Sequence, residues 1–406
     1  MQSPQERTDV VCPGKRARGA PPKLPMQQLW LAVLVGTIRH TKHLSSIWRN
    51  RCLESTGSFP AVQLTYEAVR KRLLAAGTQP LQQLFASLSL ALANWAWTKR
   101  PSALGVADFA AQVVALDETT LDAVRRLTAE LRNLPKGDPH LLVGKLAGLF
   151  DLRLQRWVRM QFRADVLAGW NIGVLTLLEG LPTGSLILAD LGYFSFPWFD
   201  YLSEQGSFWV SRLKERATSQ LKEVLAYDDR QGLLDAIVWL GKYRADRCGH
   251  AVRLILFSSG GRQYGYLTNV LDPEQLSMRE IAHLYARSFD IELAFKLLKC
   301  ELGLQIWWAA RPELVLIQLW IALILAQILH ALQLHVALQA EVEPFDISLH
   351  VMVDLLGSMP AGPTPVLDRL IEKGRLLGLI RPSTRLRLIV PELEPHMICP
   401  VPVLQD

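Results

Sequence analysis

GSLILAD, at residues 184–190, is a short apolar run that ends in an acid, Asp190. The run AAQVVALD, at 110–117, ends in the same way at Asp117. Short apolar runs bounded by turn residues are typical of buried β-strands. An acid at the end of such a strand is exposed at the rim of the sheet, on backbone that the sheet holds rigidly. The two runs therefore predict a buried sheet that carries carboxylates at its rim.

The segments between and after these runs predict a mixed α/β sheet. Further strands are expected at LLVGKLAGLFDLR (141–153), RWVRMQFRADV (156–166) and SFWVSRL (207–213). Helices are expected at NIGVLTLLEGL (171–181) and FPWFDYLSEQG (196–206). This order of strands and helices fits a mixed sheet flanked by helices better than a barrel or a helix bundle.

After residue 213 the chain leaves this alternation. GLLDAIVWLG, HAVRLILFSS and RQYGYLTNVL read as strands, which predicts a β-rich insertion at about 214–275. Helices resume at Ser277 and continue through an apolar stretch at 314–334. We therefore expect one domain at 105–340, followed by a C-terminal region at 341–406 that is interrupted by prolines.

The N-terminal part predicts a tail and a helical domain. Residues 1–26 are polar, basic and proline-bearing, which predicts a flexible basic tail. Residues 27–104 contain three helical segments, and the middle one, Leu64–Ala76, carries a basic cluster at 70–72. Three short helices with a basic middle member suit a helix-turn-helix-like DNA-binding unit. An ordinary solvated helix face is the alternative for the same charges.

The composition indicates a folded, basic protein. The chain has 406 residues, of which 50% are hydrophobic and 20% are charged, and its formal net charge is +6. Positive charge attracts polyanions, which means either nucleic acid or an anionic membrane. The cysteines form no CxxC pair, which argues against a disulfide framework and a zinc ribbon and favours free thiols. They are Cys12, Cys52, Cys248, Cys300 and Cys399.

The stretch 314–334 raises a membrane alternative, because its length approaches that needed to span a bilayer. It nevertheless contains three glutamines and His330, and it stands alone in an otherwise soluble pattern. We expect a buried core helix here. A membrane-associated protein would leave the strand-end acids unexplained.

Carboxylates on separate elements are what a hard divalent cation such as Mg²⁺ requires. A third acid is therefore sought, and Glu292 lies on a predicted helix between two apolar neighbours. Lys296 and Lys299 follow at i+4 and i+7, on the same helix face. These cations could neutralise Glu292 in an ordinary surface ion pair, or they could hold a DNA backbone beside it.

Three motifs resemble the DDE transposases of the insertion-sequence-4 type. ALDETTL (115–121) is similar to the first acid-bearing strand of that family, and LADLGYF (188–194) is close to its Asp-Arg-Gly-Tyr-Phe signature. LYARSFDIELAFKLLK (284–299) is similar to its third signature, in which a tyrosine, an arginine, a glutamate and a lysine recur along one helix. The resemblance covers about 105–335.

The resemblance implies an α/β fold: a ribonuclease-H-like mixed sheet flanked by helices, with a β-rich insertion and an N-terminal helical domain. It makes Asp117, Asp190 and Glu292 the catalytic and metal-binding triad, with two Mg²⁺ ions per site and Mn²⁺ as a substitute. Tyr285 and Lys299 take the signature positions that contact DNA. The partners implied are double-stranded DNA, as the element's terminal inverted repeats and as target, and a second copy of the chain, in the cytoplasm at the nucleoid.

Two positions depart from the family pattern. The signature arginine falls on Ser288. Arg287, which we expect to contact DNA, stands one residue earlier, about 100° away around the helix. Leu191 occupies a position where the family usually has arginine. Each departure removes an arginine that could bind a phosphate group of DNA. Neither changes Asp117, Asp190 or Glu292. The alternative is therefore a catalytically weak or inactive transposase remnant that only binds DNA.

Four further residues are candidates on weaker grounds. Arg212 and Lys214 follow a predicted core strand, which allows either DNA contact or a solvated charge run. Trp307 and Trp308 follow the helix that carries Glu292, where core packing is the first expectation and base stacking the alternative.

Overall fold

The computed structural model describes nine segments of the chain. They are residues 24–56, 59–99, 105–122, 142–163, 173–229, 232–241, 247–309, 311–359 and 364–383. The expected flexible tail lies almost entirely outside them, as do Cys12 and Cys399. The three cysteines within them, Cys52, Cys248 and Cys300, are free thiols as expected.

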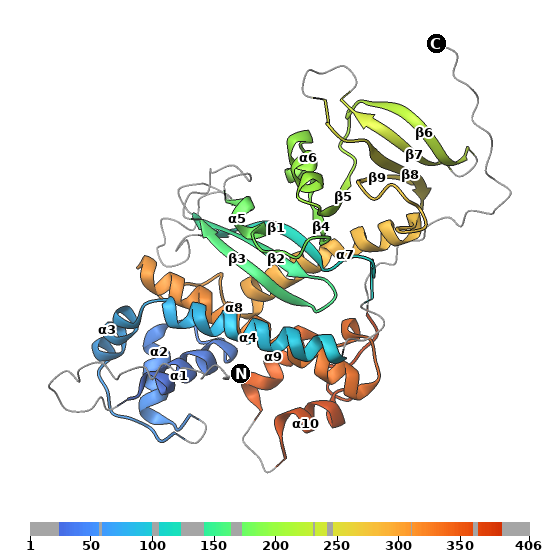
Figure 1. The fold of residues 1–406 in the computed structure, drawn as a ribbon. Coiled ribbons are helices and arrows are strands. Elements are labelled where there is room, and N and C mark those ends of the chain that lie inside the picture. The colour runs from blue at the N-terminus through green and yellow to red at the C-terminus, as the bar shows by residue number, and fades with distance from the viewer. Residues whose placement is uncertain are drawn as a thin grey trace, which may run out of the picture.

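The first five strands form the expected mixed sheet. They are β1 (Val113–Asp122), β2 (Leu142–Asp151), β3 (Arg156–Arg163), β4 (Leu186–Ala189) and β5 (Phe208–Arg212). Their order is β3-β2-β1-β4-β5, with β1 antiparallel to β2, and β4 parallel to both β1 and β5 (Figure 1). Helices flank this sheet, which confirms the ribonuclease-H-like α/β fold class.

The β-rich insertion is also present, and it extends the same sheet. It contributes β6 (Ser219–Asp228), β7 (Leu233–Leu240), β8 (Val252–Ser259) and β9 (Arg262–Thr268). β9 pairs antiparallel with β5, so the nine-stranded sheet continues as β9-β8-β7-β6. The sequence did not predict β6 as a strand, because its first five residues are exposed and it carries little apolar pattern on this outer edge.

Successive residues of β1 and β4 point to opposite faces of the sheet, and each face has its own core. One face packs against α7 (Met278–Lys296) and α8 (Pro312–Ala340). The other is covered by α5 (Val174–Leu178) and α6 (Phe196–Glu204), which lie across the sheet from α7 in Figure 1.

α8 is the apolar stretch that raised the membrane alternative. Among the described residues, its segment Pro312–Gln339 is long and apolar enough to cross a bilayer, and 78% of its most apolar window is buried inside the protein. It contacts α1, α3, α4, α9, α10 and β3. This burial is what a core helix requires, because its apolar surface is already covered by protein.

Three glutamines of α8, Gln318, Gln327 and Gln333, are buried and bind backbone from other segments. Gln318 accepts a hydrogen bond from the Trp308 amide (2.9 Å) and donates to the Ile306 carbonyl (2.9 Å). Gln327 accepts from the Trp157 amide (2.8 Å) and donates to the Trp157 carbonyl (2.9 Å). Buried polar side chains of this kind are stable only when they are paired. α8 therefore fixes the positions of β3 and of the segment after α7.

The N-terminal region contains four helices where three were expected. They are α1 (Met26–Ile38), α2 (Leu44–Leu53), α3 (Tyr66–Ala76) and α4 (Gln79–Lys99). The first predicted helical segment breaks after Ile38, where His40 takes a left-handed conformation with φ of 52°. α3 begins at its N-cap Thr65 and is followed by Gly77 with φ of 63°. Buried residues of all four helices belong to the same core as α8.

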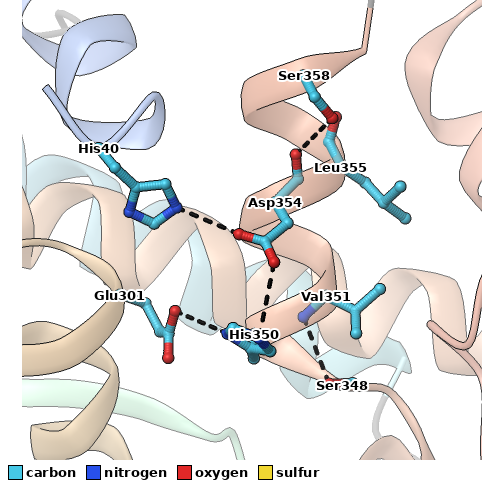
Figure 2. Close-up of polar contacts among 8 residues, drawn as sticks. All are labelled: His40, Glu301, Ser348, His350, Val351, Asp354, Leu355 and Ser358. Carbon is cyan, nitrogen blue, oxygen red and sulfur yellow. Dashed lines mark hydrogen bonds and ion pairs between the residues drawn. The ribbon is translucent and has the colours of Figure 1, made fainter.

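The C-terminal region adds α9 (Leu349–Ser358) and α10 (Val366–Lys373). A network of four side chains ties α9 to two distant segments (Figure 2). Asp354 pairs with His40 (3.3 Å) and with His350 (3.6 Å), and His350 pairs with Glu301 (2.9 Å). The network therefore joins the turn after α1 to α9 and to the segment that follows α7.

Candidate active site

Strand pairing places Asp117 and Asp190 side by side. β1 and β4 are parallel, and the last pair in their register is Leu116 with Ala189. The next residue on each strand is an aspartate, and neighbouring strands lie about 4.8 Å apart. Both side chains follow the alternation onto the face covered by α7, because Ala115 and Leu188 belong to the core on that face.

α7 brings Glu292 to the same face. The helix begins after Ser277, whose hydroxyl accepts a hydrogen bond from the Glu280 amide, as a capping residue does. Ile291 and Phe295 are buried in the core between α7 and the sheet, whereas Glu292 itself is exposed. The helix contacts β1, β4 and β5, so it brings its carboxylate to the sheet face that carries Asp117 and Asp190.

The three carboxylates influence one another electrostatically. Burial raises the pKa of the Asp117 carboxyl to about 7, the hydrogen bond from the Glu118 amide opposes this, and repulsion from Asp190 and Glu292 adds to it. Burial, and then repulsion from Asp190, raises the pKa of Glu292. Acids whose pKa values are raised by burial and by neighbouring carboxylates, as those of Asp117 and Glu292 are, are typical of functional sites.

The donor set suits a hard cation, because all three groups offer carboxylate oxygen. Asp190 directly follows β4, as expected, whereas Asp117 lies inside β1, which continues to Asp122 through its pairing with β2 and does not end at the acid as the sequence predicted. As the side chains stand, no three ligating groups in the described part of the chain are close enough to hold a metal ion. Binding would therefore require the carboxylates to turn toward one another, and the repulsion that now acts between them is the force that a cation would remove.

Tyr285 and Arg212 lie beside the acids. Burial is the largest cause that raises the pKa of the Tyr285 phenol, Asp190 adds to it, and Arg212 opposes it. The Tyr285 ring lies 5.0 Å from the ring of Tyr266 on β9. Arg212 ends β5 and is exposed, as is Lys214 two residues later. Arg212 therefore flanks the acidic rim on the side of the insertion.

Lys296 and Lys299 both follow Glu292 along the chain, but they lie in helical turns of different kinds. Lys296 is exposed in the last turn of α7, one turn beyond Glu292. Lys299 is half-buried in a π-helical turn, Leu297–Glu301, that continues directly from α7. A π-turn adds a residue per hydrogen-bonded ring and rotates the side chains beyond it, so Lys299 does not keep the simple i+7 alignment that the sequence predicted.

Arg287 is turned into the protein. Its guanidinium pairs with the buried Asp290 (2.8 Å), donates to the Leu152 carbonyl and lies 4.9 Å from the centre of the Phe345 ring. The side chain is 13% exposed, so here it serves the packing of α7 and not a surface for DNA. Ser288, at the signature arginine position, donates to the Tyr285 carbonyl (2.6 Å).

The two tryptophans serve the core. Trp307 is buried. The half-buried Trp308 donates from its ring nitrogen to the Thr41 carbonyl (3.3 Å), between α1 and α2. These contacts confirm core packing as their role in this structure.

A second charged group adjoins Asp117, and the sequence did not single it out. Glu118 pairs with Lys145 (2.8 Å) and with Arg163, and its amide donates to the Asp117 carboxylate (2.7 Å). Lys145 and Arg163 stand near the ends of two apolar strands, so spacing alone gave no sign that they meet Glu118. Only the register of β1, β2 and β3 brings the three together.

Two of the three acids lie in a segment that matches a known protein family. Residues 170–328 match the family described as "Transposase DDE domain", a segment that contains Asp190 and Glu292 and begins after Asp117. The match supports a DDE transposase. No curated protein matches the chain. Among solved structures, the piggyBac transposase in a synaptic complex with hairpin DNA is similar at 10% sequence identity and a TM-score of 0.44, covering 94% of this chain and 82% of that chain.

Proposed function

We propose that this protein is a DNA transposase of the insertion-sequence-4 type that cuts and joins the ends of its own element by phosphoryl transfer. The observation that carries the proposal is the parallel register of β1 and β4, which puts Asp117 and Asp190 side by side where the pairing of the two strands ends, on the sheet face that α7 covers with Glu292. The family match over residues 170–328 supports the same conclusion.

Asp117, Asp190 and Glu292 would hold the metal. Bound there as two ions per site, Mg²⁺, or Mn²⁺ in its place, would activate the attacking oxygen and stabilise the leaving one. The protein's own task is to position the DNA backbone in line with that rim and to balance its charge. The exposed cations Arg212, Lys214 and Lys296 suit this task. Tyr285 and Lys299 would contact the DNA beside them.

The proposed cutting and joining of DNA ends defines the binding partners of the protein. The substrate is double-stranded DNA, first as the terminal inverted repeats and then as target, and the net charge of +6 favours its approach. Two ends must be held together for joining, so we propose a homodimer on DNA, acting in the cytoplasm at the nucleoid.

The test is a cleavage assay on a labelled duplex that carries the repeats flanking the element, with Mg²⁺ or Mn²⁺. Asp190→Ala should abolish nicking at the repeat boundary and leave DNA retention intact, because it removes a ligand and no DNA-contacting cation. Asp368→Ala on α10 is a matched control, since this aspartate is exposed and lies on a different part of the fold. Full activity of Asp190→Ala would refute the assignment.

A second candidate function is DNA binding without cleavage. It is favoured by the inward position of Arg287 together with Ser288 and Leu191, because the signature arginines are then absent from the rim. Such a protein would retain the repeat duplex with a steep dependence on salt and would cut in neither metal.

A further inference from the structure

A cavity lies between α1 and α2, where the two helices approach closely. A Cβ atom on Gly36 would come within 2.7 Å of the Ile47 side chain, and both residues line the cavity. Its polar lining comes from the end of α1 and from the last turn of α2 with the residues that follow: Arg39, Asn50, Arg51, Glu54, Ser55 and Thr56. None of its lining residues belongs to the sheet or to α7, so the cavity is separate from the candidate active site.

Arg51 brings a buried positive charge to this cavity. The residue is 3% exposed. Its guanidinium donates to two uncharged groups, the Glu54 carbonyl and the Gln28 side chain, both at 3.3 Å, which is longer than the roughly 2.9 Å typical of such bonds. Within the described segments its Nε has no hydrogen-bond partner, and no carboxylate pairs with it. Because buried charges in proteins are normally paired, this guanidinium is suited to receive an anion.

The rim of the cavity carries a second arginine that is only weakly held. Arg39 and Glu54 pair at 3.5 Å, and their side chains are 48% and 64% exposed. An exposed pair of this kind is screened by water and contributes little, so an anion can draw Arg39 away from Glu54 at small cost. The formal charges of the lining, two arginines against one glutamate, leave an excess of one positive charge. The exposed Asn50 and Ser55 add neutral groups that can form hydrogen bonds.

We propose that this cavity binds a phosphate group of the DNA backbone, with Arg51 donating from its depth and Arg39 from its rim. A guanidinium offers its N–H groups in a planar fork that matches phosphate oxygens. A protein with a net charge of +6 attracts DNA without regard to its sequence. The choice of DNA over free phosphate rests on the proposed function.

The basic cluster on α3, which the sequence suggested as a DNA contact, is already engaged by the protein. Arg70 donates two hydrogen bonds to the Glu67 carboxylate, at 2.7 and 2.8 Å, and Lys71 lies 4.0 Å from the same carboxylate. A phosphate would have to displace Glu67 to reach them. Arg51 offers its charge without such a competitor, which makes the cavity the stronger candidate of the two.

The test measures DNA binding by the full-length protein without metal and without the element's repeats. Fluorescence anisotropy of a labelled duplex of unrelated sequence is followed over a series of salt concentrations in EDTA. Arg51→Met should weaken binding about tenfold and lower the slope of log affinity against log salt by about one, as the loss of one phosphate contact does. Arg70→Met is the matched control, because it removes the same charge from an arginine that Glu67 already holds, and it should change affinity by less than about twofold.

The melting temperature separates this role from support of the fold. Removing a buried charge that has no counter-charge relieves its desolvation, so Arg51→Met should melt at the same temperature as the unaltered protein or higher. If Arg51 served only to hold the end of α2, through its bond to the Glu54 carbonyl, the variant would melt at a lower temperature and bind DNA unchanged. That combination would overturn the inference.

A second pair of variants decides the matter if Arg51→Met fails to fold. Glu54→Gln removes an exposed carboxylate that competes for Arg39, and it should strengthen DNA binding several-fold. Glu67→Gln makes the same change on α3 and should have a smaller effect, because the carboxylate that it removes lies outside the cavity. Equal effects of the two substitutions would reduce the cavity to general charge and overturn the inference.

The remaining outcomes distinguish the source of the phosphate and the proposed function. Inorganic phosphate that raises the melting temperature of the unaltered protein but not of Arg51→Met, with DNA binding equal in both, would assign the cavity to free phosphate and overturn DNA as its occupant. Loss of the slope change in Arg51→Met but not in Arg70→Met would likewise return the DNA contact to α3. Failure of the repeat-cleavage assay would refute the proposed function and leave these binding measurements as they stand.

Discussion

Arg287 and Ser288 are neighbours on α7, but their side chains point in different directions. One position along the helix decides whether an arginine could reach DNA or is buried in the protein. Arg287 lies about 100° around α7 from the signature position, and this rotation directs it toward Asp290 and the Leu152 carbonyl. The sequence revealed the mismatch, but the inward partners could not be foreseen, since they come from the turn after β2 and from α7 itself.

Ser288→Arg should therefore restore a cation beside the rim without disturbing the Arg287 pair. We expect DNA affinity to rise several-fold and the slope of log affinity against log salt to steepen by about one, the signature of one added phosphate contact. Ser288→Gln supplies comparable bulk without charge and should leave the slope unchanged. An unchanged slope for Ser288→Arg would show that position 288 does not face DNA.

At the scale of elements, the apolar runs were sufficient to locate most strands and helices. Strands β1 to β5 and β7 to β9 were predicted because burial gives them continuous apolar or alternating patterns. β6 was missed because it is an exposed edge. The break between α1 and α2 was missed although it falls in the polar stretch 39–43, where His40 takes a left-handed conformation. The π-turn after α7 has no sequence signature, and it decides where Lys299 lies.

The Trp157 backbone offers a test of how α8 positions the sheet. Gln327→Leu would leave the Trp157 amide and carbonyl buried without their partner, which costs about 3 kcal/mol of unfolding free energy. Denaturant titration measures the loss. Gln339→Leu, at the exposed end of the same helix, should change stability by less than about 0.5 kcal/mol. Equal effects of the two substitutions would show that the buried amide contributes nothing specific.

For the molecule as a whole, the side chains in Figure 2 connect regions that the sequence assigned to separate domains. The turn after α1, helix α9 and the segment after α7 meet at Asp354 and His350. Spacing could not predict this meeting, because the first of these segments is far from the other two along the chain. The boundary expected near residue 104 does not separate two cores, since the N-terminal helices pack into the core that contains α8.

This connection should make stability depend on pH. The Glu301 carboxylate, and then Asp354, raises the pKa of His350, whereas burial and Arg381 oppose the rise. A histidine whose pKa is raised by folding stabilises the folded protein below its unfolded pKa of about 6.5, and this contribution is lost as pH rises through the folded pKa. Glu301→Gln should therefore lower the melting temperature at pH 6 and leave it unchanged at pH 8.5.

The control for this pH dependence is Glu343→Gln, an exposed glutamate at the N-cap before residue 344, which should have the same effect at both pH values. Thermal unfolding of both variants and of the unaltered protein gives the comparison. A destabilisation by Glu301→Gln that is equal at pH 6 and pH 8.5 would contradict a charged His350 as its cause.

The central position of α8 has a consequence for how the protein is made. A ribosome releases the chain from its N-terminus, so helices α1 to α4 and the whole sheet leave the exit tunnel before Pro312–Ala340 does. Until then, the surfaces that α8 covers on α4 and β3 have no partner. Translation that stops between β9 and α8 would release a product in which the surfaces of α4 and β3 that α8 covers are exposed, suited to chaperone capture or aggregation. The core on the face of α7 and α8 is complete only when synthesis has passed residue 340.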